Sequence, residues 1–221
     1  MSALRLATQS DTDAETLGRL MVGAFPQMFV RIPGPSRLVH ARAVGFALRG
    51  FGAMSKVWFA EAGGAPVGFI LMRWGNRETP LHALRALVAM LRELGFWRTL
   101  WVALRVPPPP PRWLHPGEAY LSAIGVVPDQ RGQGVGAVLL RHAIAQARQR
   151  GYRRLSLRVE AANAAAIRFY RRHGFHAVRG DWDWLFHALR RDFGQVFMTY
   201  AIDAPGPAAE RSGAPALKAG P

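Results

Sequence analysis

Three glycines alternate with other residues in the segment Arg131–Gly136, Arg-Gly-Gln-Gly-Val-Gly, shortly after an apolar run that ends at Pro128. Proline cannot continue a strand ladder, and a helix-forming sequence begins at the last glycine. Without side chains at Gly132 and Gly134, the backbone can turn tightly and approach a ligand closely. The free N–H groups of the first helical turn then attract an anion, helped by the helix dipole. The segment therefore predicts a diphosphate cradle, to which Arg131 adds a formal charge.

This segment differs from the two best-known phosphate loops. A P-loop continues with Lys and Ser or Thr after its last glycine, whereas Ala137 and Val138 follow here. The Rossmann fingerprint has another glycine spacing and follows the first strand of its unit. Taken alone, a structural turn without a ligand explains the glycines equally well, so the assignment depends on the residues that come after it.

A second group of residues lies one predicted strand downstream, between Arg158 and Phe175. Asn163 is a good N-cap for an alanine-rich helix. Tyr170 comes seven residues later, which places it two turns along the same face. Gly174 is suited to end the helix, so that Phe175 re-enters the sheet.

Together the two segments resemble the core of the GNAT superfamily of N-acetyltransferases. Arg131–Gly136 resembles the family's Arg/Gln-x-x-Gly-x-Gly/Ala acetyl-CoA loop. Asn163 with Ala166, Phe169-Tyr170 and Gly174-Phe175 resembles its Asn-x-x-Ala…Phe-Tyr…Gly-Phe segment. The close match covers about a quarter of the chain, and the order of the flanking strands is compatible over residues 3–202.

The resemblance implies that the protein uses acetyl-CoA as co-substrate and no metal. The residues implied to hold the cofactor are Ile124, Val126, Arg131, Gly132, Gln133, Gly134, Val135, Gly136, Asn163 and Tyr170. Val126 would hydrogen-bond the pantetheine arm from a strand that splays away from its neighbour, and Asn163 would lie beside that arm. The segment Arg131–Gly136 would hold the pyrophosphate.

The implied reaction is the transfer of the acetyl group to a primary amine, by direct attack in a ternary complex. Such attack needs a neutral amine, a donor for the oxyanion and a proton for the departing sulfur. Tyr170 is the implied general acid, since a phenol with a pKa of about 10 can supply that proton. Glu118 resembles, in its spacing, the base glutamate of enzymes that acetylate ribosomal protein amino termini. Alternatives are Ser122, which can position a water, and His115.

Hydrophobic periodicity predicts the elements that position these residues. We expect strands over residues 3–7, 56–62, 66–74, 120–127, 154–159, 175–178 and 195–202, and helices over 14–25, 36–54, 81–106, 134–150 and 163–172. This order predicts an α/β fold of the GNAT type, with a mixed, mostly antiparallel sheet and helices on both faces. We expect residues 1–202 to form one domain and the Ala-, Gly- and Pro-rich residues 203–221 to form a disordered tail.

A helical insertion at about residues 75–117 departs from the family pattern. Its apolar face includes Leu84, Val88, Leu91, Trp97 and Trp101, and a face of this size is rarely left exposed. We expect the sheet to cover part of it, and an acceptor, a partner chain or a membrane surface to cover the rest. We therefore expect an amine acceptor with an apolar portion rather than a polyamine.

Composition limits the remaining function classes. The 221 residues include 29 Lys and Arg against 14 Asp and Glu, which gives a formal net charge of +15. Cysteine is absent, which excludes disulfides, thiolate metal sites and a cysteine nucleophile. Because the amino-terminal part has acidic residues and no basic-then-apolar leader, we expect a cytoplasmic protein, monomeric or homodimeric.

Two other functions are compatible with the same residues. A non-catalytic module that binds and senses acyl-CoA would need the glycine loop but neither the acid nor the base. A nucleic-acid-associated protein would use the ten arginines between Arg131 and Arg172, but no aromatic-interleaved basic motif or recognition helix accompanies them. We therefore expect no nucleic-acid partner.

Overall fold

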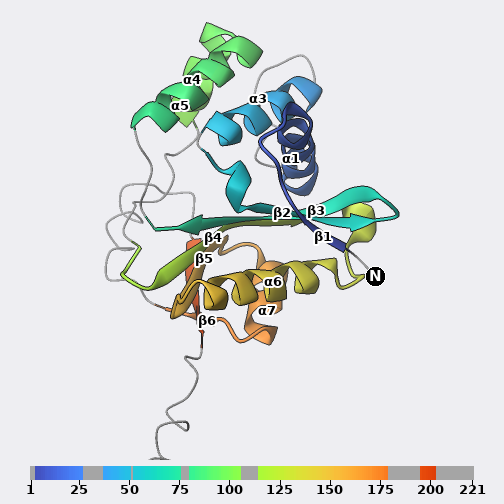
Figure 1. Ribbon diagram of the computed structural model, residues 1–221, viewed down its shortest axis with the longest axis vertical. Coiled ribbons are helices and arrows are strands. Elements are labelled where there is room, and N and C mark those ends of the chain that lie inside the picture. The colour runs from blue at the N-terminus through green and yellow to red at the C-terminus, as the bar shows by residue number, and fades with distance from the viewer. Residues whose placement is uncertain are drawn as a thin grey trace, which may run out of the picture.

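The computed structural model describes residues 3–26, 37–50, 52–75, 80–105, 114–178 and 195–202. Its centre is a seven-stranded sheet in the order β1-β2-β3-β4-β5-β7-β6 (Figure 1). The strands are β1 (Ala3–Leu6), β2 (Val57–Ala62), β3 (Ala65–Trp74), β4 (Glu118–Val126), β5 (Arg154–Glu160), β6 (His176–Ala177) and β7 (Gln195–Ala201). Neighbours are antiparallel except for β4 and β5, which run parallel. The mixed, mostly antiparallel sheet expected from the sequence is thus confirmed.

Helices cover both faces of this sheet. The described helices are α1 (Asp11–Ala24), α3 (Arg37–Gly50), α4 (Pro80–Leu94), α5 (Phe96–Arg105), α6 (Val135–Gln149) and α7 (Ala164–Arg172). Figure 1 shows α1 and α3 on one face and α6 and α7 on the other. The periodicity of β3 follows from this arrangement: Phe69 and Leu71 belong to the core under α1, whereas Ile70 and Met72 belong to the core under α6. Because both faces are covered, this strand is a nearly continuous apolar run.

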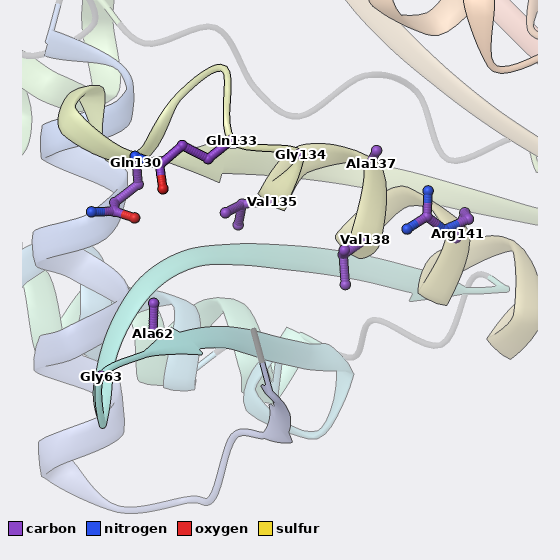
Figure 2. Close-up of a pocket in the computed structure, with 9 residues that line it drawn as sticks. All are labelled: Ala62, Gly63, Gln130, Gln133, Gly134, Val135, Ala137, Val138 and Arg141. Atoms are coloured by element: carbon purple, nitrogen blue, oxygen red, sulfur yellow. The ribbon is translucent and has the colours of Figure 1, made fainter. Parts of the chain in front are cut away.

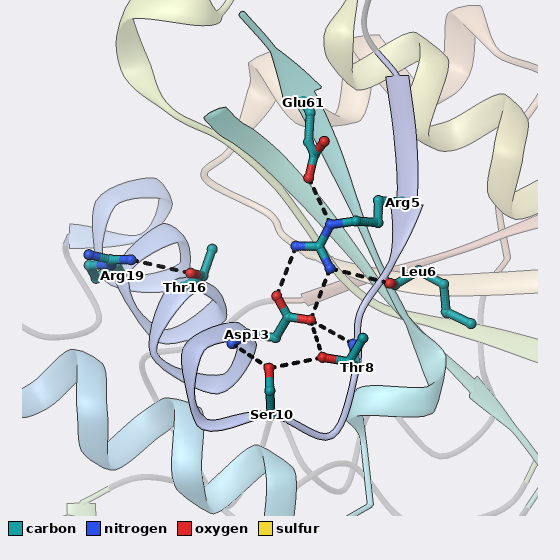
Figure 3. Close-up of polar contacts among 8 residues, drawn as sticks. All are labelled: Arg5, Leu6, Thr8, Ser10, Asp13, Thr16, Arg19 and Glu61. Atoms are coloured by element: carbon teal, nitrogen blue, oxygen red, sulfur yellow. Dashed lines mark hydrogen bonds and ion pairs between the residues drawn. The ribbon is translucent and has the colours of Figure 1, made fainter. Parts of the chain in front are cut away.

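A polar network fixes the start of α1 against the sheet (Figure 3). The Ser10 hydroxyl caps the helix by accepting from the Asp13 N–H at 3.1 Å. The Asp13 carboxylate accepts from the guanidinium of Arg5 at 2.8 and 2.9 Å, and from both the N–H and the hydroxyl of Thr8. Arg5 also donates to Glu61 of β2 at 2.8 Å. The hydrogen bonds from Arg5 hold the pKa of Asp13 well below its usual range.

Replacing Asp13 with Asn should therefore lower the free energy of unfolding at neutral pH by about 1–3 kcal/mol. Since the folded state depresses the pKa of Asp13, its contribution is fully present above a pH of about 4 and is lost as the pH falls below that value. Urea titrations at pH 7 and at about pH 2.5 should show the difference between wild type and Asp13→Asn shrinking at the lower pH. The exposed Asp129 offers the control Asp129→Asn, which should leave stability within about 0.5 kcal/mol. If Asp13→Asn lowered the free energy of unfolding equally at both pH values, the proposed role of the ionised carboxylate would be contradicted.

The insertion folds as a helical hairpin on the outer side of α3. The prediction of a single helix over residues 81–106 is wrong in one respect, because Gly95 adopts φ 78° and divides the segment into α4 and α5. The sequence did not predict this break, because the apolar periodicity continues on both sides of Gly95. Figure 1 shows both helices beyond α3, away from the sheet. The expectation that the sheet covers part of their apolar face is also wrong, since α4 packs on α3 and α5 on α4.

Other boundaries differ little from the expected ones. The helix expected over residues 36–54 ends at Gly50, and Gly52 then takes φ 68° before a short 3-10 turn at Met54–Lys56. The proposed tail, residues 203–221, lies outside the described residues. Among the helices that the structure describes, none has both the length and the apolar character needed to cross a bilayer.

Candidate active site

Strands β4 and β5 separate near the middle of the sheet. They pair only from Glu118–Arg154 to Leu121–Leu157. Beyond this point β4 continues along β3 to Val126, and β5 continues along β7 to Glu160. The facing edges, residues 122–126 of β4 and 158–160 of β5, form no backbone ladder with each other. The Val126 carbonyl is used by Arg131 and the Arg158 N–H by Tyr120. Backbone groups on such edges that have no protein partner are available to an extended ligand, which can add between them as a strand would.

A β-bulge in β4 coincides with the point of separation. The register with β3 passes from Leu71–Ala123 to Met72–Leu121, so that Ser122 has no partner in β3. As a result Leu121 and Ile124 both pack on the α6 side of the sheet, although they are three residues apart. Bulges bend a strand and are common beside active sites. Here the bulge directs the second half of β4 away from β5.

The predicted glycine loop lies at the end of β4 and opens α6. Gly132 and Gly134 have φ values of 78° and 82°, in the left-handed region that favours glycine. A Cβ atom on either residue would meet no atom within 4 Å, so the outer side of the loop is open. The N–H groups of Val135, Gly136 and Ala137 belong to the first helical turn and have no backbone acceptor among the described residues. The loop therefore presents free donors and the positive end of the α6 dipole.

A cavity of about 510 Å³ adjoins this loop (Figure 2). Its walls are Gln130, Gln133, Gly134, Val135, Ala137, Val138 and Arg141, with Ala62 and Gly63 of the β2–β3 turn opposite. Arg141 lies two helical turns after Gly134 and brings a cation to the same cavity (Figure 2). Sequence reasoning missed Arg141, although its spacing of seven residues from Gly134 was a usable signal. The loop and Arg141 together can hold a phosphorylated ligand.

Arg131 joins the loop to two other elements. Its Nε donates to the Val126 carbonyl at 3.1 Å, and a terminal nitrogen donates to the Ala24 carbonyl at 3.2 Å, at the end of α1. Gln133 acts similarly, since its side-chain amide donates to the Asp129 carbonyl at 3.2 Å. Both side chains thus shape the loop, and their direct contact with a phosphate stays a prediction.

Asn163 and Tyr170 mark the two ends of α7. The Asn163 side chain accepts from the Ala166 N–H at 3.0 Å, which confirms the predicted N-cap. Tyr170 is 7% exposed, and its ring packs on Phe169 and Phe175. Burial raises the pKa of the Tyr170 phenol, and the nearby phenol of Tyr120 raises it further. Tyr170 therefore stays protonated at alkaline as well as at neutral pH.

Tyr120 is the second tyrosine of this group, and sequence reasoning treated it only as a strand residue. It lies on the paired half of β4 and is 8% exposed. Burial raises its pKa, while the charges of Arg158 and Arg73 and the main-chain N–H of Arg158 act in the opposite direction. The Arg73 guanidinium lies 5.0 Å from the centre of the Tyr120 ring. Two phenols and two guanidinium groups therefore gather where β4 and β5 part.

The candidate bases occupy different positions around this point. Glu118 is the first residue of β4 and is buried, with Oε2 accepting from the His115 N–H at 3.1 Å. The His115 side chain is exposed in the preceding turn. Ser122 is exposed at the bulge. No hydrogen bond joins Glu118, at the start of β4, to Tyr170 on α7.

In the described part of the chain, no three His, Asp or Glu side chains lie close enough together to hold a metal ion.

The sequence model described as the acetyltransferase (GNAT) family matches residues 35–175, which include the splayed strands, the glycine loop and α7. The chain belongs to this family. One segment is similar to the streptothricin acetyltransferase of Streptomyces lavendulae, 54% identical over 55 residues, which are 25% of this chain and 29% of that protein. The ribosomal protein bS18-alanine N-acetyltransferase of Escherichia coli (strain K12) is 48% identical over 59 residues, 27% of this chain and 40% of that protein. The matches thus span well under half of these curated relatives.

Solved structures of GNAT proteins confirm the fold over almost the whole chain. One described as an acetyltransferase superposes with a TM-score of 0.64 at 18% identity, covering 91% of this chain and 100% of that one. The PaiA N-acetyltransferase of Thermoplasma acidophilum, solved in complex with coenzyme A, superposes with a TM-score of 0.53 at 14% identity, covering 91% and 99%. At such identities the similarity concerns the fold alone.

Proposed function

We propose that this protein is an N-acetyltransferase that transfers the acetyl group of acetyl-CoA to a primary amine within a ternary complex. The observation that carries the proposal is the continuity of the open backbone edge of β4 with the glycine loop and the α6 N-terminus. A ligand with an extended amide-containing arm and a pyrophosphate matches both parts at once. Membership of the GNAT family supports the same assignment.

The cofactor would follow this edge from the sheet to the helix. Its pantetheine arm would lie between residues 122–126 and 158–160, with Ile124 and Val126 on one side and Asn163 near the other. Its pyrophosphate would accept from the first N–H groups of α6, where the donors have no backbone acceptor. Arg141 would add a cation on the cavity side of the loop. The cofactor's thioester would then reach the part of the cleft beside Tyr170.

Transfer would proceed by attack of the neutral amine on the thioester carbonyl carbon. The new C–N bond forms a tetrahedral intermediate, and the C–S bond then breaks. The Tyr170 hydroxyl would give its proton to the departing thiolate, since a phenol is protonated at neutral pH and can act as a general acid. The excess proton of the amine would pass to Glu118, directly or through a water, with Ser122 at the bulge as the alternative water-positioning group.

The acceptor's chemistry is the least constrained part of the proposal. Curated relatives carry names as different as streptothricin acetyltransferase and ribosomal protein bS18-alanine N-acetyltransferase, so the family does not choose an acceptor. Arg73 and Arg158 lie beside Tyr120 where the acceptor amine must arrive, and the whole chain carries +15 charges. Both repel a polycation. We propose an amine acceptor with an apolar portion, in the cytoplasm, where acetyl-CoA is available.

The positive charge of the protein predicts an order of kcat/KM among acceptors. The kcat/KM for aryl-alkylamines and for peptides with hydrophobic amino-terminal residues should exceed that for spermidine by about tenfold or more at low salt. The difference should narrow as salt screens the arginines. A clear preference for spermidine at either salt concentration would contradict the proposed acceptor class.

Release of free CoA thiol, followed with a thiol reagent over a panel of amines and peptide amino termini, tests the proposed activity. We expect amine-dependent release with at least one acceptor and the acetylated amine as product by mass spectrometry. Tight acetyl-CoA binding without release on any acceptor would identify an acyl-CoA-binding module instead. Salt-dependent binding to DNA or RNA that acetyl-CoA does not displace would indicate a nucleic-acid partner.

A further inference from the structure

The α4–α5 hairpin exposes an unusual number of large apolar side chains. Four lie on α4, namely Leu81, Leu84, Leu87 and Val88, and Phe96 and Trp97 follow at the start of α5. Trp97 is 78% exposed, Phe96 61% and Leu84 55%. Single exposed apolar residues are ordinary, but six on two successive helices indicate an interaction surface.

The exposure follows from the way the hairpin packs. On α4, Ala86 and Leu94 are buried, and the helix rests on α3. Leu81, Leu84 and Val88 follow one another at spacings of three and four residues, so they share one face, away from Ala86. Figure 1 shows this hairpin outside α3, with no described element on its outer side. The apolar face is therefore directed to the surroundings and not to the core.

Arginines flank the same face. Arg85 and Arg92 are seven residues apart on α4, one above the other on the helix, and both are exposed. Neither forms an ion pair with another residue that the structure describes. The single carboxylate of α4, Glu93, is bound by Arg42 of α3 at 3.0 Å. The border of the apolar face is thus cationic.

A groove of about 590 Å³ lies between α3 and α4, beside these arginines. It includes Leu84 and Val88 of the apolar face together with the guanidinium-bearing residues Arg49, Arg85 and Arg92. Arg49 is paired with Asp11, and Glu93 also lines the groove, so the two guanidinium groups here that pair with no described carboxylate are those of Arg85 and Arg92. Such groups suit phosphate. Apolar side chains and phosphate-binding groups are therefore adjacent on one surface.

We propose that the outer face of the α4–α5 hairpin docks on an anionic lipid bilayer surface. The apolar side chains would enter the boundary between headgroups and acyl chains, with Trp97 at the level where indole rings are favoured. Arg85 and Arg92 would contact lipid phosphates, and the net charge of +15 would draw the protein to the surface. A second copy of the chain fits less well, because a self-complementary contact would bring these arginines together. This proposal does not depend on the acetyltransferase activity.

Co-sedimentation of the full-length protein with vesicles tests the proposal. We expect binding to phosphatidylglycerol-containing vesicles, little binding to pure phosphatidylcholine vesicles, and release at high salt. The double variant Leu84→Ser/Trp97→Ser should weaken binding by about tenfold or more, and Arg85→Gln/Arg92→Gln should do the same. Leu6→Ser, which changes a 49% exposed leucine on the edge strand β1, and Arg148→Gln should bind as wild type does.

Two further readouts keep the test decisive. Circular dichroism spectra and urea midpoints should be the same in all variants, which shows that each still folds. Sedimentation velocity distinguishes the lipid surface from a second copy. Binding of the wild type to neither vesicle, or equal binding by all variants, would overturn the proposal. A wild-type dimer that Leu84→Ser/Trp97→Ser converts to a monomer would also overturn it and assign the face to self-association.

Discussion

Replacing Tyr170 with Phe should lower turnover by about 10²–10⁴-fold, while the affinity for acetyl-CoA stays nearly unchanged. The substitution removes one hydroxyl from a ring that is held by Phe169 and Phe175, so packing is preserved. The departing thiolate then lacks its proton donor. Because burial raises the pKa of Tyr170, the wild type should also keep its acid at alkaline pH, and turnover should not decline on its account below a pH of about 10.

Tyr152→Phe is the matched control for this experiment. Tyr152 follows α6, and its ring stacks on Trp74 of β3 with ring centres 5.6 Å apart. Tyr152 has no part in the proposed proton transfer, so the variant removes a phenol hydroxyl other than that of the proposed acid. Single-turnover kinetics with a saturating amine should show the loss for Tyr170→Phe and none for Tyr152→Phe. Near wild-type turnover of Tyr170→Phe would show that solvent protonates the thiolate, and the proposed acid would be abandoned.

Replacing Gly134 with Asp should weaken acetyl-CoA binding by about 100-fold or more, since a carboxylate would stand where the pyrophosphate accepts its hydrogen bonds. The new side chain would project into open space and would displace no neighbouring atom. Its left-handed φ of 82° adds a strain of about 1 kcal/mol, which leaves the fold intact. Calorimetry measures the binding, and circular dichroism shows whether the protein still folds.

Two variants separate charge from strain in that experiment. Gly134→Asn has nearly the same shape without the charge and should retain more of the affinity than Gly134→Asp does. Gly151→Asp introduces the same carboxylate at another glycine of positive φ, 74°, with no atom within 4 Å of its Cβ, beyond the far end of α6. It should bind acetyl-CoA as wild type does. Unchanged affinity in Gly134→Asp would remove the glycine loop from the cofactor site.

Local features of the site were accessible from the sequence because each depends on a short segment. Asn163 caps α7 as expected, because a side-chain oxygen at that position satisfies an unpaired N–H whatever the rest of the fold does. The glycine loop is recognisable for the same reason: the positive φ at Gly132 and Gly134 excludes most other residues.

Features of the site that depend on distant elements could not be predicted from the sequence. The end of the β4–β5 ladder at Leu121–Leu157 results from pairing with β3 and β7, and no single segment encodes it. Tyr120 has the sequence character of any buried strand residue, and only the neighbouring Arg73 and Arg158 give it a special environment. Likewise, periodicity identifies the apolar face of residues 81–101, but it does not say that α3 leaves most of this face uncovered.

Amide hydrogen exchange of the full chain, with and without acetyl-CoA, tests the central claim most directly. If the cofactor lies along the splayed strands and the glycine loop, protection should rise in residues 122–126, in residues 158–160 and at the start of α6, and nowhere else to a similar degree. The groove between α3 and α4 should exchange at an unchanged rate. Binding of acetyl-CoA that leaves these three segments unprotected, or that protects the α3–α4 groove in their place, would contradict the account.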